Sequence, residues 1–286
     1  MSRAWGAALL LPALAGCEPS LDVELTAAGR DGVTDVVLPV IAVRLLDNAN
    51  GSHAYEVDPA LDDDLLDHLD GARTPLLGGA EPDTRGYAGI TLGFDLDEAL
   101  VRTSDGAAYP VVMTAEPDYA DLDLDVADGD SVDIVVALDL RFSLADRRSS
   151  LGSYQLAPVL RAVKRGRAAL IAGTVSRSLV ESDGCRDGRS AGIGVAVYAY
   201  AGHGVTPADY VRGTTGSGMP VASAAVRGGD DGTYRYVLAA LAPGDYTLAL
   251  TCDGDADDPH SSDELSFRAT AQLTLDSGEE ATLHLP

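Results

Sequence analysis

Short apolar runs separated by turn-forming clusters are the feature that most constrains the fold of this chain. Residues 34–46 form such a run, rich in β-branched side chains, and the turn cluster 47–51 ends it before Tyr55 and Val57 resume the pattern as a hairpin. Further runs in the first part of the chain lie at 21–25, 87–92, 99–102, 109–113 and 132–144. This alternation is typical of strands and turns, so we expect an all-β fold.

One segment of the first part has a different period. At 62–69 leucines recur at helical spacing, acidic residues occupy the first turn, and Gly71 follows as a stop signal. The pattern predicts one short helix on the β scaffold.

The second part of the chain repeats the strand-and-turn pattern. Turn signals separate strands that we expect near 169–176, 191–201, 219–226, 232–239, 245–252, 264–275 and 279–285. A chain of 286 residues is longer than one ordinary β domain needs. We therefore expect two β-sandwich domains in tandem, at 21–163 and 168–286, joined by a linker at 164–167.

The chain begins with the features of an export signal. Arg3 supplies a positive charge ahead of the apolar run 7–14, which is too short to span a bilayer as a helix. The residues Leu14-Ala15-Gly16-Cys17 then resemble the lipobox of bacterial lipoproteins, whose cysteine is acylated and becomes the new N-terminus. An ordinary secretory signal with a chance cysteine is the alternative.

The lipobox resemblance implies a cellular location. It implies removal of residues 1–16, lipidation of Cys17 and a lipidated tether at 17–20, hence a protein anchored in the bacterial cell envelope without a transmembrane helix. Glu18 stands where the family's strongest inner-membrane retention signal has Asp, which favours the outer membrane.

Charge excludes one class of partner. The chain has 45 acidic and 20 basic residues, a net charge of -25, whereas nucleic-acid binding depends on neutralising phosphates. We expect no nucleic-acid partner. The one basic cluster, 164–167, is interpreted as the joint between the domains, and a patch for phosphate or a lipid headgroup is the alternative.

The first domain resembles a known family. Its motifs, in order and spacing, are Asp64-Leu65-Leu66, Gly71-Ala72, Leu76-Leu77, Asp105-Gly106 before Tyr109-Pro110, Leu138-Asp139-Leu140 before Ser143-Leu144, and the segment 154–163. They resemble the domain-of-unknown-function 4382 family of bacterial and archaeal surface lipoproteins, with a departure in the loop 77–86. That family has no established activity, so the resemblance implies a fold and an address and leaves the ligand open.

The second domain contains a recognisable hairpin. Tyr234, Tyr236 and Leu238 share one strand face, and Tyr246, Leu248 and Leu250 share another, with Pro243-Gly244 as the turn between the strands. This hairpin is similar to that of prealbumin-like and carboxypeptidase-regulatory-like β-sandwich domains. The shared residues belong to core and turn, so no binding residues are implied.

No catalytic constellation is visible in the sequence. The nucleophile elbow, the phosphate-binding loop, the zinc-protease motif and the paired-cysteine motif are all missing. The histidines are scattered singly and are interpreted as surface residues: His53, His68, His203, His260 and His284. We therefore predict that the protein is not an enzyme and expect no catalytic residue.

Two acidic stretches could offer oxygen ligands to calcium. Residues 121–130 alternate leucine with aspartate, which is typical of a strand with one wet face, and they lack the offsets of an EF-hand loop. The second stretch is a loop, and Asp253, Asp255 and Asp257 are its candidate calcium ligands. We expect no metal and no cofactor, and calcium bound by this second stretch is the alternative.

Two cysteines remain once Cys17 is acylated. Export permits a disulfide, and if consecutive strands alternate in direction, the loop 177–190 and the end of the strand 245–252 fall at the same pole of the second sandwich. We therefore predict a disulfide between Cys185 and Cys252. Two free cysteines on mobile loops are the alternative.

Three function classes stay open. The leading interpretation is a non-enzymatic envelope lipoprotein that binds an unknown protein or glycan partner or acts as a spacer. A carbohydrate-binding module that uses a loop tyrosine such as Tyr210 is the alternative, and a hydrolase is the third class.

Overall fold

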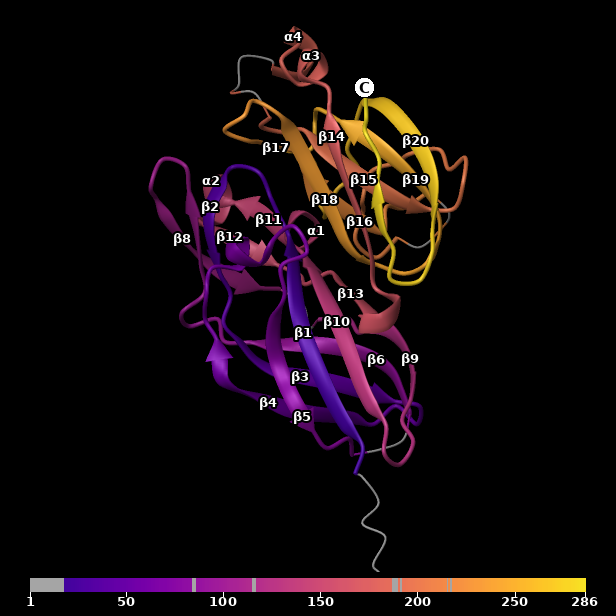
Figure 1. The fold of residues 1–286 in the computed structure, drawn as a ribbon. Helices are drawn as coiled ribbons and strands as arrows, with labels where there is room; N and C mark the ends of the chain where they lie inside the picture. The colour runs from indigo at the N-terminus through magenta and orange to yellow at the C-terminus, as the bar shows by residue number, and fades with distance from the viewer. Residues whose placement is uncertain are drawn as a thin grey trace, which may run out of the picture.

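Strands dominate the chain (Figure 1). The computed structural model describes residues 18–83, 86–114, 117–186, 190, 192–214, 216 and 218–286, so the expected signal peptide and Cys17 lie outside the described residues. The all-β fold is confirmed, with multiple sheets of the β-sandwich type. Within the described ranges no helix has the length and apolar composition needed to cross a membrane.

The first half of the molecule contains three sheets. Its strands are β1 (Ser20–Ala28), β2 (Val33–Val37), β3 (Val40–Asp47), β4 (Ser52–Leu61), β5 (Thr74–Ala80), β6 (Gly86–Phe94), β7 (Leu100–Thr103), β8 (Ala108–Met113), β9 (Ala120–Asp125), β10 (Ser131–Asp139), β11 (Leu144–Arg147), β12 (Ser153–Leu156) and β13 (Leu160–Lys164). The sheet orders are β13-β10-β1-β5, β11-β12-β8-β7-β2 and β4-β3-β6-β9. β1 and β10 lie parallel, from Ser20 opposite Ser131 to Ala28 opposite Asp139.

The core of the first half follows from alternation within the strands. Leu21, Val23 and Leu25 of β1 are fully buried and pack with inward-facing residues of the other strands. The acidic strand β9 alternates buried and exposed residues along its length, so the expectation that its aspartates line a wet face is confirmed.

The first half contains more helix than the sequence indicated. The expected helix at 62–69 is a short 3₁₀ turn, η1 (Leu65–His68), capped by the Asp64 carboxylate, which accepts from the amide of Leu66. Two short helices, α1 (Leu140–Ser143) and α2 (Arg148–Leu151), accompany it.

The position of α1 corrects one sequence prediction. The run 132–144 does not continue as one strand, because β10 ends at Asp139, whose side chain caps α1 through the amide of Phe142. The apolar residues that follow Asp139 are therefore wound into a helical turn before β11 begins.

The second half forms two facing sheets. Its elements are η2 (Arg165–Arg167), β14 (Ala169–Val175), α3 (Arg177–Val180), α4 (Asp183–Arg186), β15 (Ala196–Ala201), β16 (Ala222–Ala225), β17 (Arg227–Gly228), β18 (Tyr234–Leu241), β19 (Gly244–Thr251), β20 (Phe267–Leu275) and β21 (Glu280–Thr282). The sheet orders are β17-β18-β14-β21 and β16-β15-β19-β20. The predicted buried faces of β18 and β19 are confirmed, because Tyr234, Tyr236, Leu238, Tyr246, Leu248 and Leu250 all lie in the core of this half. The predicted hairpin is wrong, because β18 pairs with β14 and β17 while β19 pairs with β15 and β20, so Pro243-Gly244 carries the chain from one sheet to the other.

Close packing at the C-terminus depends on one glycine. A side-chain carbon at Gly173 of β14 would collide with the backbone carbonyl of Leu283, which follows β21. Because glycine has no such carbon, the last segment of the chain can lie directly along β14, where Leu283 donates its amide to Ala172 and accepts from the Tyr236 hydroxyl.

The two halves meet over an apolar surface. Phe142 of α1 packs with Tyr198 and Tyr200 of β15, and its ring is stacked on Tyr210 with centroids 4.2 Å apart. A second apolar contact joins Ala137 of β10 to Ala240 of β18. The first half is therefore in intimate contact with the outer face of the β16-β15-β19-β20 sheet.

Candidate functional site: buried charges between loops and halves

The Asp139 carboxylate is a fully buried polar link between the halves. Its Oδ1 accepts from the hydroxyl of Ser223 in β16 at 2.7 Å, and its Oδ2 accepts from the Ser223 amide at 2.8 Å. Arg161 of β13 lies 3.4 Å from the same Oδ2 and donates to the carbonyls of Val221 and Ala239 in the second half. One aspartate thus caps α1 and holds β16 at the same time.

Arg141 is a second buried charge in the contact between the halves. Its guanidinium pairs with Asp31 at 2.8 Å and donates to the carbonyl of Gly254 in the second half. Burial acts to lower the pKa of Arg141, but the charge of Asp31, its hydrogen bond and the nearby Tyr198 and Asp257 together outweigh burial, so the pKa lies above the usual range and the side chain stays charged.

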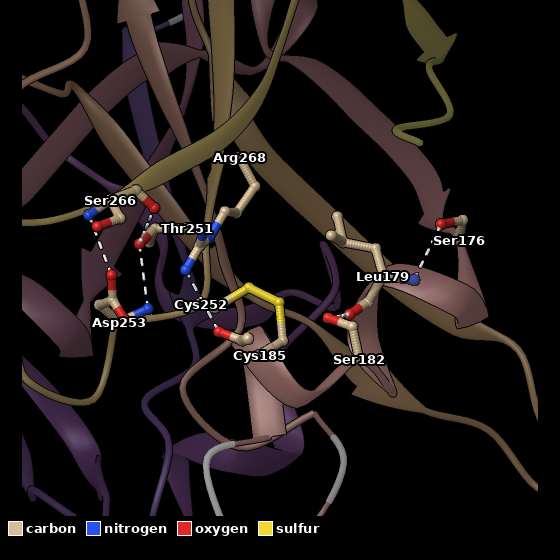
Figure 2. The surroundings of a disulfide bond; sticks show 10 residues. Ser176, Leu179, Ser182, Cys185, Thr251, Cys252, Asp253, Ser266 and Arg268 are labelled. Atoms are coloured by element: carbon tan, nitrogen blue, oxygen red, sulfur yellow. Dashed lines mark hydrogen bonds between the residues drawn. A yellow bond between two sulfur atoms is a disulfide. The ribbon is translucent and has the colours of Figure 1, made fainter.

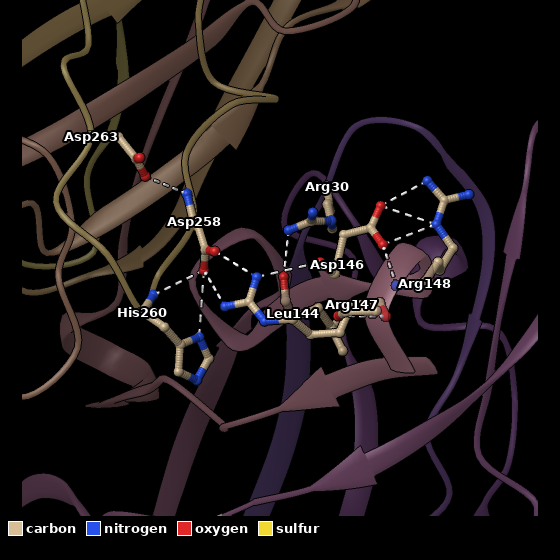
Figure 3. A network of polar contacts seen from close by, with 9 residues as sticks. Arg30, Leu144, Asp146, Arg147, Arg148, Asp258, His260 and Asp263 are labelled. Atoms are coloured by element: carbon tan, nitrogen blue, oxygen red, sulfur yellow. Dashed lines mark hydrogen bonds and ion pairs between the residues drawn. The ribbon is translucent and has the colours of Figure 1, made fainter. Parts of the chain in front are cut away.

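A polar network extends from this contact along the loop between β19 and β20 (Figure 3). Asp258 forms a two-bond ion pair with Arg147, at 2.6 and 3.1 Å, and its own amide donates to the Asp263 carboxylate at 2.8 Å. Arg148 makes a similar pair with Asp146 within the first half. The loop carrying Asp263 is therefore joined directly to the first half.

Three aspartates of the second half form a cluster. One carboxylate oxygen from each of Asp209, Asp257 and Asp263 lies within 4.8 Å of the others. Asp209 belongs to the loop between β15 and β16, and the other two belong to the loop between β19 and β20. We call these residues the aspartate cluster.

The aspartate cluster is anchored to the sheet beneath it. The Tyr198 hydroxyl donates to Oδ2 of Asp257, and the amide of Asp263 donates to Oδ2 of Asp209. Burial raises the pKa of Tyr198 well above its usual range, so this phenol remains a donor. The two loops are thereby held face to face over β15.

Burial also perturbs the cluster itself. It raises the pKa of Asp257, and the neighbouring Asp209 adds to the rise while Tyr198 and Arg141 oppose it. It likewise raises the pKa of Asp209, with the charge of Asp263 adding to the effect. Crowded carboxylates out of water favour any partner that removes their negative charge.

The predicted disulfide is present (Figure 2). Cys185 of α4 is bonded to Cys252, which directly follows β19, and their Cα atoms lie 4.9 Å apart. β14 ends and β15 begins at this pole, as the alternating topology required. Nearby, Asp253 accepts from the amide of Ser266 at 3.0 Å.

Other sequence candidates are spread over the molecule. Of the predicted calcium ligands, only Asp257 belongs to the aspartate cluster; Asp253 lies beside the disulfide, and the cluster does not include Asp255. Cys17 lies outside the described residues. Within the basic stretch 164–167, Lys164 ends β13 and Arg165 pairs with Glu24 at 2.9 Å.

The histidines and the loop tyrosine Tyr210 also have identified neighbours in the structure. Four of the five histidines each lie beside a different aspartate, and these four pairs lie in different parts of the chain. The fifth histidine, His284, contacts the Thr174 hydroxyl. Tyr210 is half-buried against Phe142, so its ring is part of the contact between the halves.

Sequence reasoning missed Asp139, Arg141, Asp209 and Asp263. The acidic stretch 253–258, which suggested calcium, is followed by two more acidic residues, Asp263 and Glu264. This extension is the sequence signal that could have revealed Asp263. Asp209 stands singly in its loop and offers no local pattern.

Comparisons with known proteins give only distant likenesses. No protein-family model matches the chain, and no curated protein sequence matches it. Among solved structures, the TIE protein of Bacillus anthracis is 11% identical at a TM-score of 0.21, over 92% of this chain and 33% of that one. A candidate adhesin from Bacteroides ovatus is 12% identical at a TM-score of 0.21, over 100% of this chain and 99% of that one.

A third similar structure is the fimbrial anchor protein Mfa2 of Porphyromonas gingivalis. It is 11% identical at a TM-score of 0.18, over 84% of this chain and 80% of that one. The chain spans about a third of the first structure named and about a quarter of a leucine-rich repeat protein from Bacteroides thetaiotaomicron. The similarity to bacterial surface adhesins and fimbrial proteins is thus distant, and TM-scores this low carry no argument.

Proposed function

We propose that the protein is a non-enzymatic lipoprotein of the bacterial cell envelope, anchored through acyl chains on Cys17, whose β-sandwich halves present loops to a protein partner. The proposal includes the outer membrane as its location and the domain division 21–163 and 168–286. We also propose that the first domain is related to the domain-of-unknown-function 4382 family and the second to prealbumin-like and carboxypeptidase-regulatory-like sandwiches.

The observation that carries the proposal is the position of the first strand. β1 starts at the end of the molecule opposite to the second half (Figure 1). Cys17 precedes Ser20, the first residue of β1, by three positions, a reach of roughly 10 Å for extended chain. An anchor at Cys17 would hold the first half against the membrane and direct the second half, with its disulfide-tied loops, away from it.

Sugar binding receives less support from the structure than protein binding. Tyr210, the loop tyrosine that a sugar-binding site would use as a stacking platform, has one ring face against Phe142. The loops at the far pole of the second half are instead tied down by the disulfide, which suits presentation of a fixed surface.

Metabolic labelling with an acyl probe tests the anchor. Wild type should be labelled and found in the membrane fraction, whereas Cys17→Ser should be unlabelled. The matched control is the double variant Cys185→Ser/Cys252→Ser, which retains Cys17 and should be labelled like wild type. Equal labelling of wild type and Cys17→Ser would refute the anchor.

The partner is tested separately by cross-linking the full chain in intact cells. We expect a specific protein to be captured through the second half. Capture of glycan alone would replace the protein partner by the carbohydrate-binding alternative.

A further inference from the structure

Two carboxylate oxygens of the aspartate cluster are buried without a donor. Oδ1 of Asp257 and Oδ1 of Asp209 receive no hydrogen bond from an amide or hydroxyl donor in the part of the chain that the structure describes, and the two carboxyl groups face each other within hydrogen-bonding reach. Both residues are more than nine-tenths buried, at 3% and 8% exposure. The loss of water at a buried oxygen of this kind is uncompensated unless a proton or a cation meets it.

The other oxygens of these two residues are already satisfied by the protein. Oδ2 of Asp257 accepts from Tyr198, and Oδ2 of Asp209 accepts from the Asp263 amide. Their hydrogen bonds fix the carboxylates in orientation. The unpartnered oxygens are therefore held in place by the fold, as the ligands of a pre-formed site are.

The charge around the aspartate cluster is unbalanced. The nearest buried cation is Arg141, and its charge is already matched by Asp31, at 2.8 Å. The three carboxylates therefore share part of one positive charge that is already paired with Asp31, and their negative charge remains in excess. A divalent cation would remove most of this excess, whereas a single shared proton would remove only one charge.

The spacing of the oxygens is compatible with calcium. Calcium takes oxygen ligands at about 2.3–2.6 Å, so two of its ligands can lie up to about 5 Å apart. The three oxygens lie within 4.8 Å of one another. Magnesium is less suited to a site of three protein carboxylates, because it dehydrates reluctantly and keeps several of its water molecules.

Two of the three aspartates are reached from an open groove. Asp209 and Asp263 line an open groove of about 680 Å³, whose walls come from the two loops and from Phe267 at the start of β20. An ion entering by this groove could retain water molecules on its open side, which would complete the six to eight ligands that calcium takes.

We propose that Asp209, Asp257 and Asp263 bind one calcium ion. The ion would bridge the β15–β16 loop to the β19–β20 loop over Tyr198. Because the amide of Asp258 donates to Asp263 and the Asp258 carboxylate pairs with Arg147, the bound ion would also steady the contact between the two halves. The site is independent of the lipid anchor.

The test uses the full chain, stripped of metal with EDTA and then titrated with CaCl₂. Isothermal titration should give one ion per chain with a Kd of about 10⁻⁴ to 10⁻³ M, the range of extracellular calcium modules. Calcium at a hundredfold excess over Kd should raise Tm by about 5 °C or more. Terbium should give luminescence excited through tyrosine, because Tyr198 contacts the Asp257 carboxylate.

Variants locate the ion. Asp257→Asn keeps the size of the side chain and its contact with Tyr198, and it should weaken calcium binding at least tenfold. Asp263→Asn, at a less buried position, should do the same. Asp253→Asn is the matched control, because it lies in the same acidic loop but outside the aspartate cluster, and it should bind calcium like wild type.

Two results would overturn the proposal. Wild type that shows neither heat, nor a shift in Tm, nor terbium luminescence would mean that the carboxyls share a proton instead of an ion. Calcium binding that persists unchanged in both Asp257→Asn and Asp263→Asn would place the ion elsewhere. The wild-type titration decides the first point even if one variant fails to fold.

Discussion

Replacing Asp139 by alanine should weaken the contact between the two halves more than any surface change. The carboxylate is fully buried and accepts from four groups: the Ser223 hydroxyl, the Ser223 amide, the Phe142 amide and the Arg161 guanidinium. Alanine removes the cap of α1, the attachment of β16 and the countercharge of Arg161 in one step.

The expected loss follows from what is left behind. Removing one partner of a buried ion pair typically costs about 3–5 kcal/mol, because the other charge stays in the interior without a countercharge. Arg161 retains two carbonyl acceptors at 3.3 Å, which reduces the cost, while the Ser223 amide loses its acceptor, which adds to it. We therefore expect Asp139→Ala to lower the free energy of unfolding by about 4 kcal/mol.

Urea unfolding followed by circular dichroism and tyrosine fluorescence measures this loss. Asp133→Ala is the matched control, since Asp133 lies on the same strand, is 41% exposed and faces Arg165 at 3.9 Å. An exposed pair of this kind contributes at most about 1 kcal/mol. Equal effects of the two substitutions would refute the view that Asp139 is a desolvated link between the halves.

Two further predictions concern the disulfide and the joint. Reducing the Cys185–Cys252 bridge, which spans a sequence separation of 67, should lower the free energy of unfolding by about 4 kcal/mol on the chain-entropy model. Intact-mass analysis of the unreduced, denatured protein after alkylation checks that the bond exists, because two alkylated thiols would show that it is absent. Trypsin should cut first at the exposed turn containing Arg165 and Arg167, and the two fragments should elute together in gel filtration and separate only in urea. Early cuts scattered over both halves would contradict the domain division, and fragments that elute apart would contradict a strong contact.

Local pattern was sufficient for much of the fold. β18 and β19 lie where the alternation of tyrosine and leucine predicts them, because the alternating residues of both strands face the core between the two sheets. Their pairing differs from the prediction, because Pro243-Gly244 connects one sheet to the other and does not close a hairpin. The disulfide followed from the two cysteines left besides Cys17 and from strand direction, since alternating strands bring the end of β19 to the same pole as the end of β14.

The contact between the halves could not be predicted in the same way. Leu138-Asp139-Leu140 reads as ordinary strand sequence, and only the tertiary structure shows that Asp139 ends β10 and reaches Ser223, 84 residues later in the chain. Arg141 lies within an apolar run and reads as an exposed residue, yet its side chain is 1% exposed, because Asp31 and Gly254 approach it from distant segments. Such partners have no fixed spacing, so periodicity cannot reveal them.

The acidic surface and the buried charges have opposite physical consequences. Exposed aspartates such as those of β9 are solvated and raise the net negative charge without fixing any geometry. Asp139, Asp257 and Asp209 are removed from water, so each requires a specific donor or countercharge, and each donor comes from another element. Because these few aspartates join α1, β15, β16 and the loops above them, the arrangement of the two halves depends on satisfying a small number of buried carboxylates. Changes in their protonation or ion occupancy should therefore alter the contact between the halves, while changes to the exposed aspartates should not.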